Sequence, residues 1–77
     1  MNYVVVAELV ANVGEVLVAE GDPVDPSDTL VILKSMKMEI PVLAEVGGKV
    51  SEMAVQQGDS IRDGDVIAVI DQGRAGP

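Results

Sequence analysis

One lysine of this chain, Lys37, lies between two methionines in the stretch Ser35-Met36-Lys37-Met38. The deprotonated amine of a lysine is a nucleophile on a flexible four-carbon stem. Taken alone, a lysine in a turn is most often a solubilising charge. Methionine, however, stands where such a turn would carry Asn, Gly or Asp, and its soft thioether suits surfaces that meet several partners. The alternation favours a lysine that is presented to another molecule.

The composition excludes most kinds of catalytic site. The chain has 77 residues and contains neither cysteine nor histidine, so thiolate metal sites, disulfides and Ser-His or Cys-His nucleophile pairs are ruled out. The formal net charge of −8 argues against nucleic acid and anionic membranes as partners, and it suits a partner with a positive surface. No apolar run approaches the length of a membrane span, and the first residues lack the basic region of a signal peptide. The simplest interpretation is a cytoplasmic protein.

The chain contains an internal repeat. When it is shifted by 37 residues, residues 4–33 align with residues 41–70 without a gap, and nine of the thirty pairs are identical. Composition alone gives about three identities by chance. The identical pairs are Val5/Val42, Ala7/Ala44, Glu8/Glu45, Val13/Val50, Glu15/Glu52, Val18/Val55, Gly21/Gly58, Asp22/Asp59 and Asp28/Asp65. The chain is therefore a duplicated half.

Each half predicts the same series of short strands. Branched aliphatic residues favour strands, and turns rich in Gly, Pro and Asp separate the apolar runs. We expect strands over 3–7, 13–18 and 29–34 in the first half, and over 42–46, 50–55 and 66–71 in the second. Several short strands at this spacing indicate an all-β barrel or sandwich with pseudo-two-fold symmetry. We expect one domain over residues 1–77, with an ordered core of about 3–71 and a flexible tail over 72–77.

The segment that joins the halves, residues 34–40, contains the lysine. Under pseudo-two-fold symmetry this segment lies at one end of the barrel, and the two chain ends meet at the other. The sequence therefore predicts a tight hairpin at a tip, with Lys37 exposed at its apex.

The stretch Ser35-Met36-Lys37-Met38 resembles the Ala/Ser-Met-Lys-Met attachment motif of biotinyl domains, the carriers of biotin-dependent carboxylases. Residues 41–44, Pro-Val-Leu-Ala, and 48–50, Gly-Lys-Val, resemble the strand and turn that follow the biotinyl lysine in that family. The resemblance spans about residues 3–71. The tetrapeptide alone is a weak signal, but combined with the duplication and its central position it is a strong one.

The resemblance implies a flattened β-barrel of two four-stranded antiparallel sheets, with the attachment lysine on a hairpin tip. A biotin protein ligase would join biotin to Lys37 as an amide. The tethered biotin would then carry a carboxyl group from a biotin carboxylase to a carboxyltransferase, while the carrier, expected to be a monomer, performs no catalysis and has no catalytic residue. Met36 and Met38, with Ser35, would lie beside the cofactor or against the partner enzymes.

The chain departs from the family pattern in three places. Lys34 stands where the family usually has Glu, residues 7–12 replace a turn that usually contains Pro and Gly, and the inserted "thumb" of some bacterial carriers is missing from the first half. The missing thumb suggests a thumbless, stand-alone carrier. Two alternatives remain: a lipoyl carrier, whose lysine typically lies in Asp-Lys-Ala, and an unmodified interaction module on the same fold, which Lys34 favours.

The acidic residues read as structural. Asp22, Asp25 and Asp28 do not match the pattern of a calcium loop, and two of them recur in the second half, so we expect turn chemistry and no metal site. Glu15 and its counterpart Glu52 are expected on the solvent face of strands.

Overall fold

The computed structural model describes residues 2–73. Within this range it contains eight strands and no helix. The strands are β1 (Asn2–Val6), β2 (Ala11–Val16), β3 (Pro23–Val24), β4 (Thr29–Ser35), β5 (Met38–Leu43), β6 (Gly48–Met53), β7 (Ser60–Ile61) and β8 (Val66–Asp71). The predicted tail falls mostly on residues 74–77, which lie outside the described part.

The strands form two four-stranded antiparallel sheets, which confirms the predicted fold class. One sheet has the order β1-β8-β6-β3 and the other β5-β4-β2-β7. Adding four to each strand number, cyclically, converts one order into the other, so the duplication in the sequence is a pseudo-two-fold axis in the fold. Each sheet takes two strands from each half, so neither half can complete a sheet without the other.

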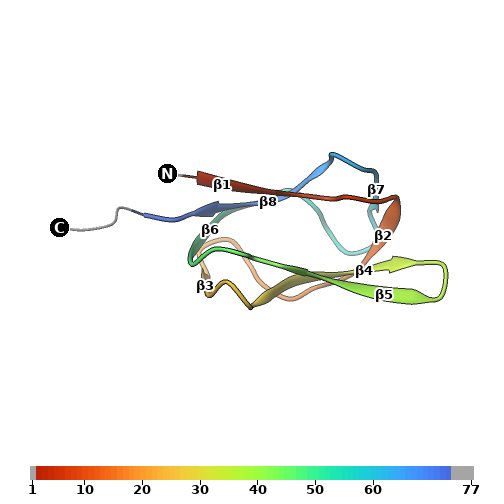
Figure 1. Ribbon diagram of the computed structural model, residues 1–77, viewed down its shortest axis with the longest axis horizontal. Coiled ribbons are helices and arrows are strands. Elements are labelled where there is room, and N and C mark those ends of the chain that lie inside the picture. Colours follow the sequence, from red (N-terminus) through yellow and green to blue (C-terminus); the bar gives the residue numbers. More distant parts are fainter. Residues whose placement is uncertain (1, 74–77) are drawn as a thin grey trace.

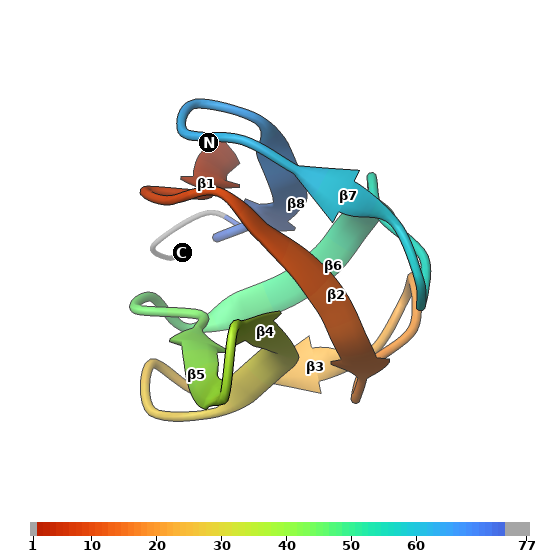
Figure 2. The same ribbon diagram turned by 90° about the vertical axis from the view of Figure 1, so that its right-hand side faces the viewer.

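The molecule is elongated, and its two ends differ. Both described chain ends lie at one end of the long axis, and the β4–β5 hairpin projects at the other, as the repeat predicted (Figure 1). Viewed from the hairpin end, the strands are arranged around the long axis of the molecule (Figure 2). Among residues 2–73 there is no helix of the length and apolarity needed to cross a membrane.

A single apolar core fills the space between the sheets. Its members are Val5, Ala7, Ala11, Val13, Val24, Leu30, Val31, Leu33, Ala44, Val50, Val55, Ile61, Ile67, Ala68 and Ile70. Leu30 and Val31 are both buried although they are adjacent, because the register shifts between Thr29 and Val31 and leaves Leu30 as an extra residue. Ile67 is the extra residue at the equivalent position of the second half. The bulges therefore repeat along with the sequence.

Aspartates close four equivalent turns. The carboxylate Oδ2 atoms of Asp22, Asp28, Asp59 and Asp65 each accept a hydrogen bond from the backbone N–H three residues earlier, at 2.8–2.9 Å. The N–H of each aspartate returns a bond to the carbonyl of that same earlier residue. These paired bonds satisfy backbone groups that the strands leave free. The expected turn chemistry is confirmed.

Several predicted strand limits were wrong. The second strand of each half begins and ends two residues earlier than predicted, and β5 begins at Met38 instead of at residue 42. Val55 belongs to the core, and Val18 packs against the core. Both nevertheless lie outside the strands, just before an aspartate turn. Apolar character marked these residues as interior but did not place them in a strand. Glu15 and Glu52 are exposed in β2 and β6, as expected.

Candidate functional site

The hairpin tip, defined as Ser35–Met38, ends the longest strand pairing in the molecule. β4 and β5 are paired from Thr29 and Leu43 up to Ser35 and Met38. Only two residues, Met36 and Lys37, remain for the loop. The predicted tight hairpin is therefore present, and it lies within the seven-residue segment that joins the halves.

Met36 has an unusual backbone conformation. Its φ of 58° lies in the left-handed region, where both turn types that commonly close two-residue hairpins place their first central residue. Gly, Asn and Asp adopt this conformation most readily, whereas other residues are disfavoured by about 1–2 kcal/mol. The chain thus carries a methionine at a position where glycine or asparagine would be more stable.

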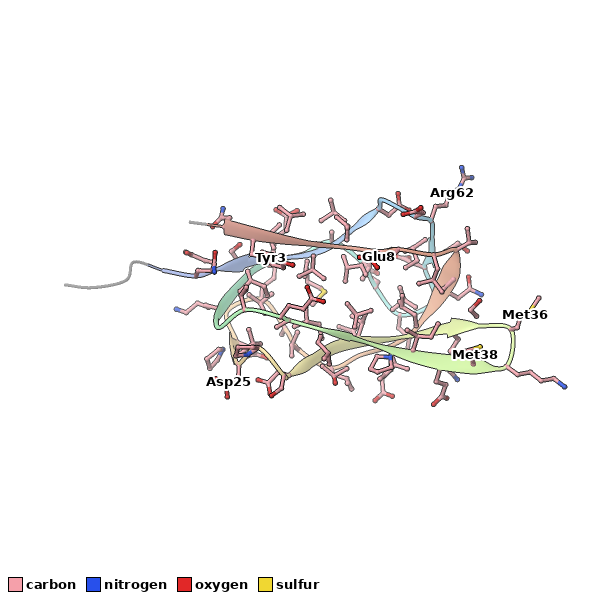
Figure 3. All side chains as sticks on the ribbon, viewed as in Figure 1. Tyr3, Glu8, Asp25, Met36, Met38 and Arg62 are labelled. Atoms are coloured by element: carbon pink, nitrogen blue, oxygen red, sulfur yellow. The ribbon has the colours of Figure 1, made fainter. Side chains whose placement is uncertain are left out.

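The side chains of Met36, Lys37 and Met38 are exposed to solvent. The relative exposure of Met36 is 101% and that of Met38 is 64%, and Lys37 is exposed as well. In Figure 3 the labelled Met36 projects beyond the end of the hairpin. Leu33, only three residues before Met36, is fully buried. A rigid, anchored strand pair therefore holds a lysine and two apolar side chains in solvent.

The two lysines near the tip lie in different surroundings. Within residues 2–73, the amine of Lys37 forms neither a salt bridge nor a hydrogen bond to another side chain. Lys34 instead faces Glu39 across the strand pair, with Nζ 3.8 Å from a carboxylate oxygen. The stem of Lys34 lies over the backbone of Gly14, where an added Cβ would come within 2.8 Å of it. Lys34 is therefore held along the sheet, whereas Lys37 extends into solvent.

The acidic residues do not form a second site. In the part of the chain that the structure describes, no three carboxylates come together in a way that could hold a metal ion. Asp25 forms the first residue of an aspartate turn, in agreement with the expected turn chemistry.

Two features, one at the hairpin tip and one away from it, were not predicted from the sequence. The strained conformation of Met36 was not predicted, because methionine is not a residue type that indicates a positive φ. A hydrogen bond between the Tyr3 hydroxyl and Glu45, at 2.8 Å, joins residues 42 apart in the sequence. The repeat could not reveal this bond, because the counterpart of Tyr3 is Ile40, which has no hydroxyl.

The chain is similar in sequence to proteins of mycobacteria. The chain is 68% identical over 37 residues to the biotinylated protein TB7.3 homolog of Mycolicibacterium smegmatis. It is 65% identical over 37 residues to the biotinylated protein TB7.3 of Mycobacterium tuberculosis. Each match covers 48% of this chain, and the chain spans about half, 52%, of the length of these relatives.

Solved structures show the same fold. The urea carboxylase of Kluyveromyces lactis matches with a TM-score of 0.85 and 31% identity, over 92% of this chain and 6% of that protein. A single-chain, multi-domain long-chain acyl-CoA carboxylase matches with a TM-score of 0.86 and 26% identity, over 96% and 7%. The lipoyl domain of the 2-oxoglutarate dehydrogenase complex of Azotobacter vinelandii matches with a TM-score of 0.74 and 19% identity, over 91% and 99%, and shares the fold alone.

The family comparison covers most of the chain. The biotin/lipoyl family model, described as "Biotin-requiring enzyme", matches residues 4–70. This range contains both halves of the repeat and the whole hairpin tip. The protein therefore belongs to the biotin/lipoyl attachment family.

Proposed function

We propose that this protein is a biotin carrier in which Lys37 is the attachment residue. The observation that carries the proposal is the hairpin tip itself. It presents an amine that has no side-chain partner among residues 2–73, between two exposed methionines at the end of the longest strand pair. The family to which the chain belongs supports biotin or lipoate as the attached group. The printed names of the mycobacterial relatives, which are biotinylated proteins, support biotin.

The protein's contribution to attachment is to offer a nucleophile. Deprotonated Nζ of Lys37 would attack the carboxyl carbon of biotin, activated as its adenylate by a biotin protein ligase. A new amide bond forms, AMP leaves with the electron pair of the broken bond, and the nitrogen loses a proton. Exposure of the tip lets a ligase reach this nitrogen without unfolding any strand.

Once attached, biotin supplies the capacity to accept and release a carboxyl group. The hairpin keeps that group at the far end of the molecule from the chain ends, which would let one carrier serve two enzyme sites in turn. Tethering raises the effective concentration of the cofactor at each site. We propose a biotin carboxylase and a carboxyltransferase as these partners, because the structural neighbours include two carboxylases.

A lipoyl carrier is the second candidate, because lipoyl domains have the same fold. The flanking residues favour biotin: Met36 and Met38 match the biotinyl motif and not the Asp-Lys-Ala of lipoyl domains. An unmodified interaction module is favoured only by Lys34, whose side chain lies along the sheet and leaves the tip open. We further propose that the carrier works as a monomer in the cytoplasm, where an adenylate-forming ligase has access to its nucleotide.

The test is the intact mass of the chain after co-expression with a biotin protein ligase in the presence of biotin. We expect an increment of one biotinyl group, its loss in Lys37→Arg, and its retention in the matched control Lys34→Arg. An unmodified wild-type chain would contradict the proposal, and a lipoyl increment after co-expression with a lipoyl ligase would replace it with the second candidate.

A further inference from the structure

A groove of about 300 Å³ lies on one side of the molecule, away from the hairpin tip. It is formed between β1 and β5, each of which pairs with only one neighbouring strand and is the edge of its sheet. In Figure 1 these two strands run along the upper and lower borders of the same side of the barrel. The two sheets therefore remain open to each other along this seam.

The walls of the groove are strand edges. Consecutive residues line it on both sides, 3–9 along β1 and the loop after it, and 40–43 along β5. Because side chains alternate in direction along a strand, a wall of consecutive residues means that the backbone edge itself faces the groove. An edge of this kind offers unpaired N–H and C=O groups to an added strand. Pro41 lacks an N–H, so β1 is the better hydrogen-bonding edge.

The interior and the rims of the groove are apolar. Val5 and Leu33 form part of its floor, and the partly buried Ile40 and Val42 lie along the β5 side. Three of the exposed large apolar side chains of the described residues line the same groove: Val4, Val6 and Leu43. Apolar side chains thus gather on both sides of two open strand edges.

The charges that line the groove are all negative. They belong to Glu8 and Glu45, the equivalent residues of the two halves, and among residues 2–73 no lysine or arginine lines the groove. Glu45 accepts the hydrogen bond from Tyr3, which spans from β1 to the loop after β5. Within residues 2–73, the carboxylate of Glu8 has neither a salt bridge nor a hydrogen bond. In Figure 3 the labelled Tyr3 and Glu8 lie apart from each other.

We infer that this groove binds an extended basic segment of a partner protein. The segment adds to the free edge of β1 as a strand, places alternate apolar side chains against Ile40 and Val42, and brings a lysine or arginine to Glu8. The two open strand edges favour a partner segment in an extended conformation. The apolar lining of the groove favours apolar side chains on that segment, and the carboxylate of Glu8 favours a basic one. The site is separate from Lys37 and does not require biotin.

Titration of a peptide probe into isotope-labelled Lys37→Arg protein tests the inference, because this variant removes the attachment residue. The probe is an acetylated, amidated hexapeptide of alternating valine and lysine, and its control has glutamate in place of lysine. We expect amide shifts confined to residues 3–9 and 40–45 with the lysine peptide and none with the glutamate peptide. Glu8→Gln should weaken binding at least threefold, whereas the matched change Glu52→Gln, on the exposed face of β6, should leave it unchanged.

Three results would overturn the inference. One is the absence of localised shifts, and another is equal weakening by Glu8→Gln and Glu52→Gln, which would mean general attraction to an acidic surface. The third is the appearance of the same shifts when the protein alone is concentrated, which would identify a second copy of the chain as the occupant. Because the protein lacks Lys37 throughout, none of these results bears on biotin attachment.

Discussion

At the scale of single residues, the backbone conformation of Met36 at the hairpin tip lowers the stability of the fold. Met36 is fully exposed and makes no packing contribution, yet it occupies the left-handed region of backbone space. Strained residues persist where the surrounding structure imposes the conformation, and they cluster at functional sites. Here the paired strands on both sides impose it. Glycine or asparagine at position 36 would give a more stable fold.

Replacing Met36 with Gly or Asn should therefore stabilise the fold. Relief of the left-handed strain stabilises the folded state by about 1–2 kcal/mol. For glycine, the greater freedom of the unfolded chain offsets about 0.4–1 kcal/mol of this gain. We expect a higher midpoint in urea unfolding for both variants, and the control Met38→Gly, inside a strand, should lower it. A lower midpoint for Met36→Gly would show that the methionine side chain stabilises the tip.

Tyr3 is the other residue with an informative environment. Its hydrogen bond to Glu45 raises its pKa above the ordinary value of 10.0, and the charge of Glu45, burial and the charge of Glu8 act in the same direction. The folded protein therefore favours the protonated hydroxyl. The resulting contribution to stability is fully present below the pKa of the unfolded tyrosine, about 10. It is lost as the pH rises from there through the folded pKa.

Ultraviolet titration can follow Tyr3 alone, because the chain has one tyrosine and no tryptophan. Glu45→Gln should lower the pKa of Tyr3 toward the ordinary value, since it removes the charge of Glu45 and weakens the hydrogen bond that this charge strengthens, and it leaves burial and the charge of Glu8 in place. Glu52→Gln serves as the control and should not change it. An unchanged pKa in Glu45→Gln would mean that the hydrogen bond across the groove is absent in solution.

At the scale of elements, close contact between strands explains one glycine of a Gly-Gly pair. A Cβ added to Gly48, at the start of β6, would lie 2.3 Å from the backbone oxygen of Asp71 on β8. Nothing lies closer than 3.7 Å, at the ring of Pro26, to a Cβ added to Gly47. The two glycines are adjacent and identical in the sequence, but packing requires only Gly48.

The pair Gly47→Ala and Gly48→Ala tests this packing directly. Gly48→Ala must separate β6 from β8, and we expect a loss of more than about 2 kcal/mol in unfolding free energy. Gly47→Ala should be neutral or stabilising by about 0.4–1 kcal/mol, because alanine reduces the freedom of the unfolded chain. Urea denaturation measures both, and equal effects of the two substitutions would contradict the close approach of the strands.

At the scale of the whole molecule, the sequence predicted the symmetry better than it predicted the contacts. The repeat located the turns, because Gly21, Gly58 and their following aspartates recur at the same place in each half. It also located the hairpin tip opposite the chain ends. The exchange of strands between the halves was not predicted, because residue patterns show which face is buried and not which strands are neighbours. The groove between β1 and β5 arises from that exchange.

The candidate site could be predicted for a related reason. Lys37 and its methionines are consecutive, so the motif depends only on local sequence, and the repeat placed it at an apex. The environment of Lys34 could not be predicted, because its stem lies over Gly14, twenty positions away on a neighbouring strand. Contacts of this kind depend on the register between strands, which the bulge between Val13 and Glu15 shifts.

The most direct test of the account is to locate the modification on the biotinylated chain by cleavage after lysine and tandem mass spectrometry. An acylated lysine resists this cleavage. Biotin on Lys37 should therefore appear on a fragment over residues 35–49, cut after Lys34 and Lys49 but not internally. Biotin on a fragment that extends through Lys34 and ends at Lys37 would place it on the wrong lysine and contradict the account.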